Sequence, residues 1–177
     1  MKVIFKLFLA LFLFNMSSCS SDDSKDDGKV GDVVTIEGVW KLTALAVESS
    51  FDFNNDGVYS RNLFEETPCY LDDFINFRAD GSVNIVSALT NISVDVTSST
   101  DYEHVYECLD GLDQESSWIK EGNLVTVENG STDLEGYIFE NTLIVTLRDT
   151  FEIEMFDGTN YFYQEEDIVL EYTKVQE

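Results

Sequence analysis

The feature that most constrains the fold of this chain is a series of short β-branched and aromatic runs that starts at Val33. Short turn signals separate these runs, because their residues accept the positive backbone φ angles of tight hairpins. The turn signals are Asp80-Gly81, Glu121-Gly122-Asn123, Asn129-Gly130, Glu140-Asn141 and Asp157-Gly158. Helix signals are scarce between them. The pattern therefore predicts antiparallel strands that follow one another through hairpins.

Several runs alternate between apolar and acidic residues. Phe151, Ile153 and Met155 fall on one face of their strand, and Glu152 and Glu154 fall on the other. Such a sheet buries one face and exposes a wet, acidic one. We expect an all-β fold, an antiparallel up-and-down barrel of about 8 to 10 strands, because closure removes exposed strand edges. A two-sheet β-sandwich is the alternative.

A single folded domain is expected over residues 33–177. Hydrophobic residues make up 44% of the chain and aromatic residues 13%, which is enough apolar material for a packed core. The runs that we expect to form strands are Gly38–Val47, Leu71–Arg78, Ser82–Ala88, Ile92–Thr97, Glu103–Cys108, Ser116–Lys120, Asn123–Glu128, Leu134–Glu140, Thr142–Arg148, Phe151–Phe156 and Ile168–Lys174.

The charge of the chain excludes one class of partner. Its 35 Asp and Glu residues outnumber 10 Lys and Arg residues, and the formal net charge is −25. Proteins that bind nucleic acid neutralise phosphates with Lys and Arg, whereas this chain would be repelled by them. We therefore expect no nucleic-acid partner.

The amino terminus has the pattern of a secretory signal over residues 1–18. A basic start with Lys2 and Lys6 precedes the apolar run Leu7–Phe14, which is too short to span a membrane, since a spanning helix needs about 20 residues. The following Ser17-Ser18-Cys19 resembles the cleavage box of bacterial lipoproteins, in which the cysteine is lipidated and becomes the first residue. A plain signal peptide with an incidental cysteine is the alternative. Acyl chains on Cys19 would hold the protein at a membrane.

Residues 19–32 form a polar, acidic stretch that reads as a flexible, lipid-anchored tether. Its Ser21-Asp22-Asp23 start resembles the export signal that sends lipoproteins of some Gram-negative bacteria to the outer face of the outer membrane. This resemblance implies a surface-exposed outer-membrane lipoprotein. The alternative is a solvated linker that carries no sorting signal, on a protein that faces the periplasm.

Two further cysteines, Cys69 and Cys108, are expected to form a disulfide. An exported chain meets an oxidising compartment, and a bridge that closes a loop of about 40 residues stabilises the fold by about 3 to 4 kcal/mol. The alternative is a reactive thiol at Cys108 with His104, four residues earlier, as its partner.

The segment Gly38-Val39-Trp40-Lys41-Leu42 resembles the Gly-x-Trp signature of lipocalins and of lipocalin-like domains in bacterial lipoproteins. The resemblance covers Glu37–Lys174, and further stretches that carry it are Asp52–Gly57, Glu66–Asp73 and Phe77–Gly81. It implies that Trp40 closes one barrel end beneath a basic residue of the last strand. Period-two counting puts Lys174 on the inward face, where the family usually has Arg, so the resemblance implies a stack of Trp40 and Lys174.

The segment Asp52–Gly57 matches the first half of a calcium-binding loop, in which oxygens at alternate positions converge on one cation. The second half differs, because position twelve is Leu63 instead of an acid. A calcium site and a metal-free Asn/Asp turn both remain open, and bound calcium would be structural. The candidate ligands are Asp52, Asn54, Asp56, Val58, Glu65 and Glu66.

The sequence predicts binding and no enzymatic activity, because it has one histidine and none of the common catalytic motifs. The first hypothesis is a membrane-anchored barrel that binds a small apolar or amphipathic ligand. The alternative is a non-enzymatic surface interaction or accessory protein, with a filled barrel, that binds a protein or a glycan. The two hypotheses differ in whether the inward-facing side chains leave a cavity inside the barrel. These inward positions include Leu42, Ile153, Leu170 and Tyr172.

Overall fold

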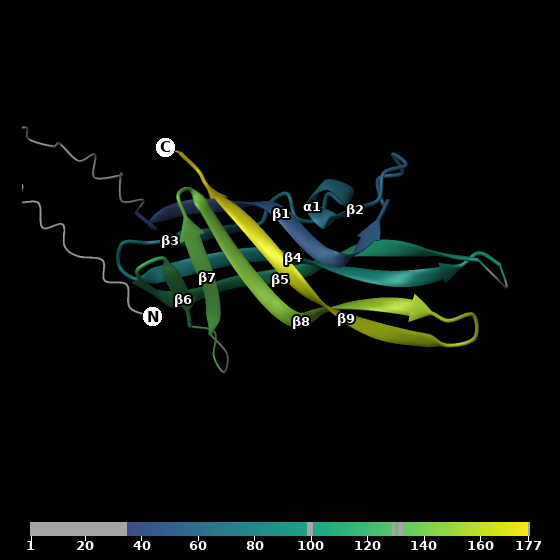
Figure 1. Cartoon of the computed structure of the whole chain (residues 1–177). Helices are drawn as coiled ribbons and strands as arrows, with labels where there is room; N and C mark the ends of the chain where they lie inside the picture. Colours follow the sequence, from purple (N-terminus) through teal and green to yellow (C-terminus); the bar gives the residue numbers. More distant parts are fainter. Residues whose placement is uncertain (1–34, 99–100, 129, 131–132, 177) are drawn as a thin grey trace, which may run out of the picture. The chain divides into compact units, whose positions relative to one another are not determined.

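The computed structural model describes residues 35–98, 101–128, 130 and 133–176 (Figure 1). All of them belong to the compact unit Val34–Glu177. The signal peptide at residues 1–18, the lipidation site Cys19 and the tether at residues 19–32 lie outside the described residues, so these expectations stay predictions.

The domain is a closed antiparallel up-and-down β-barrel, as the alternating runs predicted. Eight strands form it in the order β1-β3-β4-β5-β6-β7-β8-β9, and β9 returns to pair with β1. The short β2 pairs only with the far end of β1. The elements are β1 (Gly38–Phe51), β2 (Ser60–Asn62), α1 (Leu63–Glu66), β3 (Phe74–Phe77), β4 (Ser82–Val96), β5 (Tyr102–Glu121), β6 (Leu124–Val127), β7 (Leu134–Phe139), β8 (Thr142–Phe156) and β9 (Tyr161–Lys174).

Three strands are longer than the sequence indicated, because each joins two of the predicted runs. The joined pairs are Ser82–Ala88 with Ile92–Thr97 in β4, Glu103–Cys108 with Ser116–Lys120 in β5, and Thr142–Arg148 with Phe151–Phe156 in β8. The register of β4 on β5 shifts between Ser87 and Leu89, and that of β8 on β9 shifts between Leu147 and Phe151. Such irregularities break the in/out alternation without ending the strand.

Glycine at position 111 permits the close approach of β4 and β5 at the first of these irregularities. A Cβ atom on Gly111 would lie 1.8 Å from the backbone oxygen of Ser87. No side chain fits there, so this glycine belongs inside a strand and does not mark a turn.

The remaining differences are at strand ends. β3 starts at Phe74 instead of Leu71, since Asp73 donates its backbone N–H to the Tyr70 carbonyl in a turn. β1 ends at Phe51 instead of Val47, and β9 starts at Tyr161 instead of Ile168. The sequence reading missed β2 and α1.

The β4–β5 and β8–β9 hairpins continue well beyond the short strands β6 and β7 (Figure 1). We call their continuation, residues 92–98, 101–106 and 153–164, the hairpin extension. β4 and β8 pair there in parallel, with Ile92 opposite Ile153. Both side chains are almost fully buried, at 1% and 0% exposed, so the core runs from the barrel into the hairpin extension.

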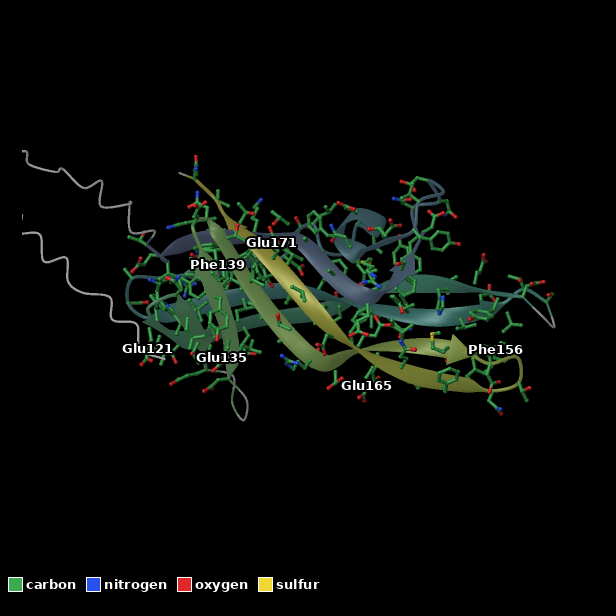
Figure 2. The ribbon with its side chains drawn as sticks, viewed as in Figure 1. Glu121, Glu135, Phe139, Phe156, Glu165 and Glu171 are labelled. Atoms are coloured by element: carbon green, nitrogen blue, oxygen red, sulfur yellow. A yellow bond between two sulfur atoms is a disulfide. The ribbon has the colours of Figure 1, made fainter. Side chains whose placement is uncertain are left out.

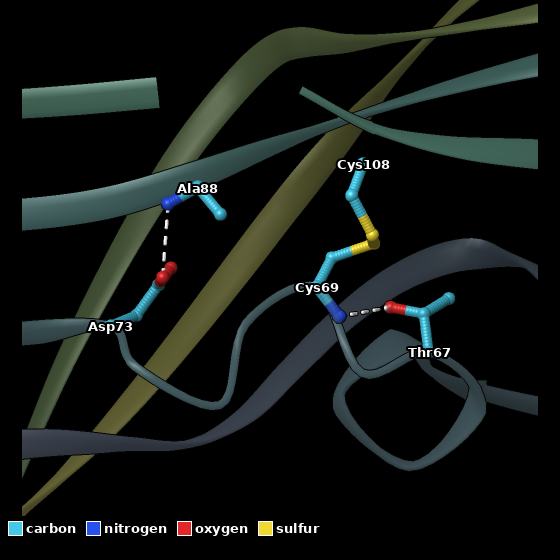
Figure 3. The surroundings of a disulfide bond; sticks show 5 residues. All are labelled: Thr67, Cys69, Asp73, Ala88 and Cys108. Atoms are coloured by element: carbon cyan, nitrogen blue, oxygen red, sulfur yellow. Dashed lines mark hydrogen bonds between the residues drawn. A yellow bond between two sulfur atoms is a disulfide. The ribbon is translucent and has the colours of Figure 1, made fainter. Parts of the chain in front are cut away.

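Three buried carboxylates satisfy backbone amides where regular strand pairing is interrupted. Asp73 accepts the N–H of Ala88 at 2.9 Å, beside the irregularity in β4 (Figure 3). Glu66 accepts the N–H of Phe53 at 2.9 Å, beyond the end of β1. Glu166 accepts the N–H groups of Glu48 and Ser49 in β1, where β9 no longer pairs with β1. The three acids are buried and these hydrogen bonds are part-buried, so the acids stabilise the fold from inside.

Candidate functional site

Trp40 and Lys174 are partners across β1 and β9. Trp40 is fully buried, and its Nε1 donates a hydrogen bond to the Ile36 carbonyl at 2.7 Å. The Lys174 Nζ lies 5.8 Å from the centroid of the Trp40 ring. Gly38, two residues before Trp40, has a φ of 117°, a value that favours glycine. The structure thus brings Gly38, Trp40 and Lys174 close together.

The predicted disulfide between Cys69 and Cys108 is confirmed (Figure 3). Its Cα atoms are 5.3 Å apart, and it joins the segment before β3 to β5 across 39 residues of sequence. Because the Cys108 sulfur is bonded to Cys69, the alternative of a reactive thiol partnered by His104 is wrong for this oxidised form.

The loop Asp52–Val58 is held by hydrogen bonds between its own side chains and amides. The two carboxylate oxygens of Asp52 accept the N–H groups of Asp56 and Gly57 at 3.0 and 3.1 Å. Asn54 Oδ1 also accepts the Asp56 N–H, and Asp56 Oδ1 accepts the N–H of Val58 at 2.7 Å. These bonds shape the loop as a chain of Asx turns.

The two candidate closing acids of the calcium loop are placed differently. Glu66 is buried and faces Phe53, whereas the Glu65 carboxylate accepts the hydroxyl of Ser60 at 3.4 Å. No group of three or more His, Cys, Asp or Glu side chains that could hold a metal occurs within the described residues. The calcium site stays a prediction, and the loop already has internal partners for its oxygens.

The interior of the barrel holds a narrow apolar cavity of about 90 Å³. Side chains from every barrel strand except β1 line it, among them Phe77, Leu143, Leu170 and Tyr172. Of the inward positions that the sequence indicated, Leu42 and Ile153 are buried in the core, while Leu170 and Tyr172 border this cavity. Small-molecule sites typically have about 300 to 1,000 Å³, so the barrel is largely filled.

A larger hollow lies outside the barrel, between the end of β1 and the start of β5. Ser50–Phe53, Asn55, Tyr59 and Tyr102–Tyr106 line this cleft of about 580 Å³, which we call the distal cleft. Tyr59 and Tyr102 are 72% and 40% exposed. The distal cleft therefore offers accessible aromatic rings beside polar groups.

Ring contacts connect five residues of the distal cleft, Phe51, Phe53, Tyr102, His104 and Tyr106, in one chain. Phe51 and Phe53 stack with centroids 4.8 Å apart, and the Phe53 ring lies 5.0 Å from Tyr106. The His104 ring lies edge-on to Phe51 at 5.4 Å and to Tyr102 at 5.7 Å. Such contacts fix ring orientation.

The chain of rings continues to the β8–β9 hairpin. Tyr102 also contacts Phe156, which lies near the end of the β8–β9 hairpin (Figure 2), and Phe156 contacts Tyr161. The centroid distances are 6.1 and 5.0 Å. These contacts link β5 to the β8–β9 hairpin.

We call the connected rings of Phe51, Phe53, Tyr102, His104 and Tyr106 the aromatic wall. His104 is neutral at physiological pH. Burial lowers the pKa of its imidazole below the ordinary value of 6.5, and a hydrogen bond with the backbone of Glu154 opposes this only in part. Its Nε2 atom is buried and has no hydrogen-bond partner. The imidazole therefore adds no positive charge to the distal cleft.

Sequence reasoning missed the distal cleft. The spacing of Phe51 with Phe53, and of Tyr102 with His104 and Tyr106, places each group on one strand face and was a usable signal. The missing information was that the end of β1 and the start of β5, about fifty residues apart in the sequence, lie against one another.

No protein-family model matches this chain, and no curated protein or solved structure matches it. Within the described residues, no helix has the length and apolar character that a membrane crossing requires. The interpretation of function therefore depends on the geometry of the barrel and of the distal cleft.

Proposed function

We propose that this protein is a lipid-anchored, surface-exposed lipoprotein of the lipocalin-like type that acts as a non-enzymatic interaction protein. Its barrel is a filled scaffold, and its outer surface binds a protein or a glycan. The acidic tether and the Ser17-Ser18-Cys19 box support the anchored part of this proposal.

The difference between the two hollows carries the proposal. The barrel interior offers about 90 Å³, whereas the distal cleft offers about 580 Å³ outside the barrel. A site for a drug-sized molecule needs about 300 Å³ or more, and of these two hollows only the distal cleft reaches that size.

The state of the most reactive groups supports a non-enzymatic role. The Cys108 sulfur is held in the disulfide, and His104 is packed between Phe51 and Tyr102. Nucleophilic catalysis by a thiol needs a free thiolate beside an available base, and this arrangement supplies neither.

A small apolar ligand inside the barrel is the second candidate, because the interior cavity is lined mainly by apolar side chains. With about 30 Å³ of liquid volume per water molecule, the cavity has room for about three waters or the end of an alkyl chain. Titration of the protein with a hydrophobic fluorescent dye decides between the two. We expect no saturable binding, and a stoichiometric dye site inside the barrel would overturn the filled scaffold.

Replacement of the lipidated residue tests the anchored part of the proposal. Cys19→Ser would remove the acylation site, and we expect the protein to move from the membrane fraction to the soluble fraction. Wild-type protein should be cleaved by protease added to intact cells. Membrane retention of the variant would contradict the lipid anchor, and protection of the wild type would contradict surface exposure.

A further inference from the structure

We infer that the distal cleft binds a cationic side chain, arginine or lysine, presented by a basic peptide segment of a protein partner. This inference rests on the proposed function, since it names the partner that the outer surface meets. Three properties of the distal cleft carry it: aromatic rings, carboxylates with no Lys or Arg among the lining residues, and a size that suits a side chain with its flanking backbone.

Ring contacts order Phe51, Phe53, Tyr102, His104 and Tyr106 before any partner arrives. Phe51 is 3% exposed and serves as the base on which Phe53 and His104 pack. Tyr59 and Tyr102 present much of their surface to solvent beside this base. A cation that lies over such ring faces is attracted by their negative quadrupole, and a fixed wall loses little entropy on binding.

The loop Asp52–Val58 positions the part of the distal cleft that carries Tyr59. Its side-chain-to-amide hydrogen bonds at Asp52 and Asp56 hold the turn immediately before Tyr59. The buried Glu66 carboxylate fixes the Phe53 amide at 2.9 Å on the other side of the loop. The loop Asp52–Val58 thus holds one side of the distal cleft in place.

The charges of the distal cleft select a cation. Asp52 and Glu103 are among its lining residues, and no Lys or Arg lines it. Within the described part of the chain, the one ion pair joins Arg78 to Glu115, which are not among these lining residues. A formal net charge of −25 attracts basic partners and repels anionic ones.

An arginine or lysine side chain can contact both the aromatic rings and the carboxylates of the distal cleft. A neutral sugar can contact the rings but cannot neutralise the carboxylates. A sugar would contact the rings and bond to Asn55 or Ser50, but it would leave the two carboxylates without a counter-charge. A guanidinium stacks on rings and also pairs with carboxylates through its planar array of donors. The observations therefore favour a basic peptide over a glycan.

The experiment measures binding of the full-length protein to an acetylated and amidated Gly-Arg-Gly peptide by NMR titration. The same peptide with citrulline, which keeps the shape of arginine and lacks its charge, is the first control. Maltohexaose is the neutral-sugar probe. We expect the arginine peptide to perturb Tyr59 and Tyr102, with at least about fivefold weaker binding of the citrulline peptide.

Paired variants separate the distal cleft from general electrostatic attraction. Tyr59→Ala removes a cleft ring that is 72% exposed, and Tyr137→Ala removes a ring from β7 that is 50% exposed and lies outside the cleft. Glu103→Gln and Glu121→Gln remove the same charge inside and outside the cleft. We expect about fivefold losses from the two cleft variants and changes below about twofold from the controls.

Equal losses from the cleft variants and their controls would overturn the inference, because binding would then follow only net charge. Binding of maltohexaose in the distal cleft without binding of the arginine peptide would also overturn it, while leaving the proposed interaction function intact. The hydrophobic-dye titration tests the filled barrel separately, so the two failures are distinguishable.

Discussion

The carboxylate of Glu166 accepts the backbone N–H of Ser49 at 2.8 Å, where β9 has separated from β1. The same Oε2 atom accepts the N–H of Glu48 at 2.9 Å, and Gln164 donates to Oε1 at 2.8 Å. The Ser49 hydroxyl also donates to Oε1. Glu166 is 1% exposed. Its carboxylate supplies the hydrogen-bond acceptors that the backbone of a paired strand would otherwise provide to β1.

Truncation of Glu166 should destabilise the domain strongly. Glu166→Ala removes the acceptor of two part-buried amides, those of Glu48 and Ser49. At about 1 to 3 kcal/mol for each, we expect a loss of about 2 to 6 kcal/mol in urea unfolding. Glu166→Gln keeps an acceptor oxygen and should lose less. The control is Glu165→Ala, because the Glu165 side chain is exposed (Figure 2). Equal effects of the Glu165 and Glu166 truncations would contradict this role.

The disulfide should contribute a large part of the stability. The double variant Cys69→Ser and Cys108→Ser opens a loop with a sequence separation of 39 residues. The chain-entropy relation gives a loss of about 4 kcal/mol in the free energy of unfolding. Chemical denaturation of the variant, and of wild type with reductant, should agree. A variant as stable as the oxidised wild type would refute this contribution.

Enlargement of the barrel cavity should convert the filled scaffold into a binding protein for small apolar molecules. Leu143 is 1% exposed and borders the cavity. We expect Leu143→Ala to cost about 3 to 5 kcal/mol and to create a dry void that binds benzene, seen as a rise in Tm. Leu71→Ala, at a residue 59% exposed, should change stability by less than about 0.5 kcal/mol. Benzene binding by wild type would show that space already exists.

Acid should destabilise the aromatic wall through His104. Burial lowers the pKa of His104 in the folded state below 6.5, so the unfolded chain binds more protons in this range. The stability contribution is present above pH 6.5 and is lost as the pH falls through the lower folded value. Thermal unfolding between pH 7.5 and 5 should show a smaller pH-dependent decrease in His104→Gln than in wild type. Parallel curves would exclude His104 as the cause.

The calcium prediction is tested by thermal unfolding with added calcium. A site with a dissociation constant of about 1 mM would stabilise the fold by about 1.4 kcal/mol at 10 mM calcium. The prediction expects a rise in Tm for wild type and none for Asp56→Ala, with magnesium as the control cation. An unchanged Tm in wild type would leave Asp52–Gly57 as a metal-free turn.

Local patterns were enough to predict the barrel. The alternation of Phe151, Glu152 and Ile153 indicates a half-buried strand, and the turn signals set the antiparallel order. The Cys69–Cys108 bridge followed from the count of cysteines in an exported chain. The strand irregularity at Ser87 could not be predicted in this way, because it breaks the alternation that reveals strands.

The candidate site depended on information that local patterns lack. The role of Glu166 was hidden because acids are usually exposed. The Glu166 side chain bonds to β1 where β9 has separated from it. The distal cleft needs Phe51 and Tyr102 to meet across a long sequence separation. Pairing of distant strands decides such contacts, and one sequence does not reveal it.

Native mass spectrometry of the protein released from its own membrane tests the filled, anchored barrel most directly. We predict the mass of a chain that starts at Cys19, carries acyl groups and contains the Cys69–Cys108 disulfide, with no apolar small molecule retained. A stoichiometric apolar molecule that leaves only on unfolding would contradict the filled barrel, and an unacylated chain that retains Met1 would contradict the anchor.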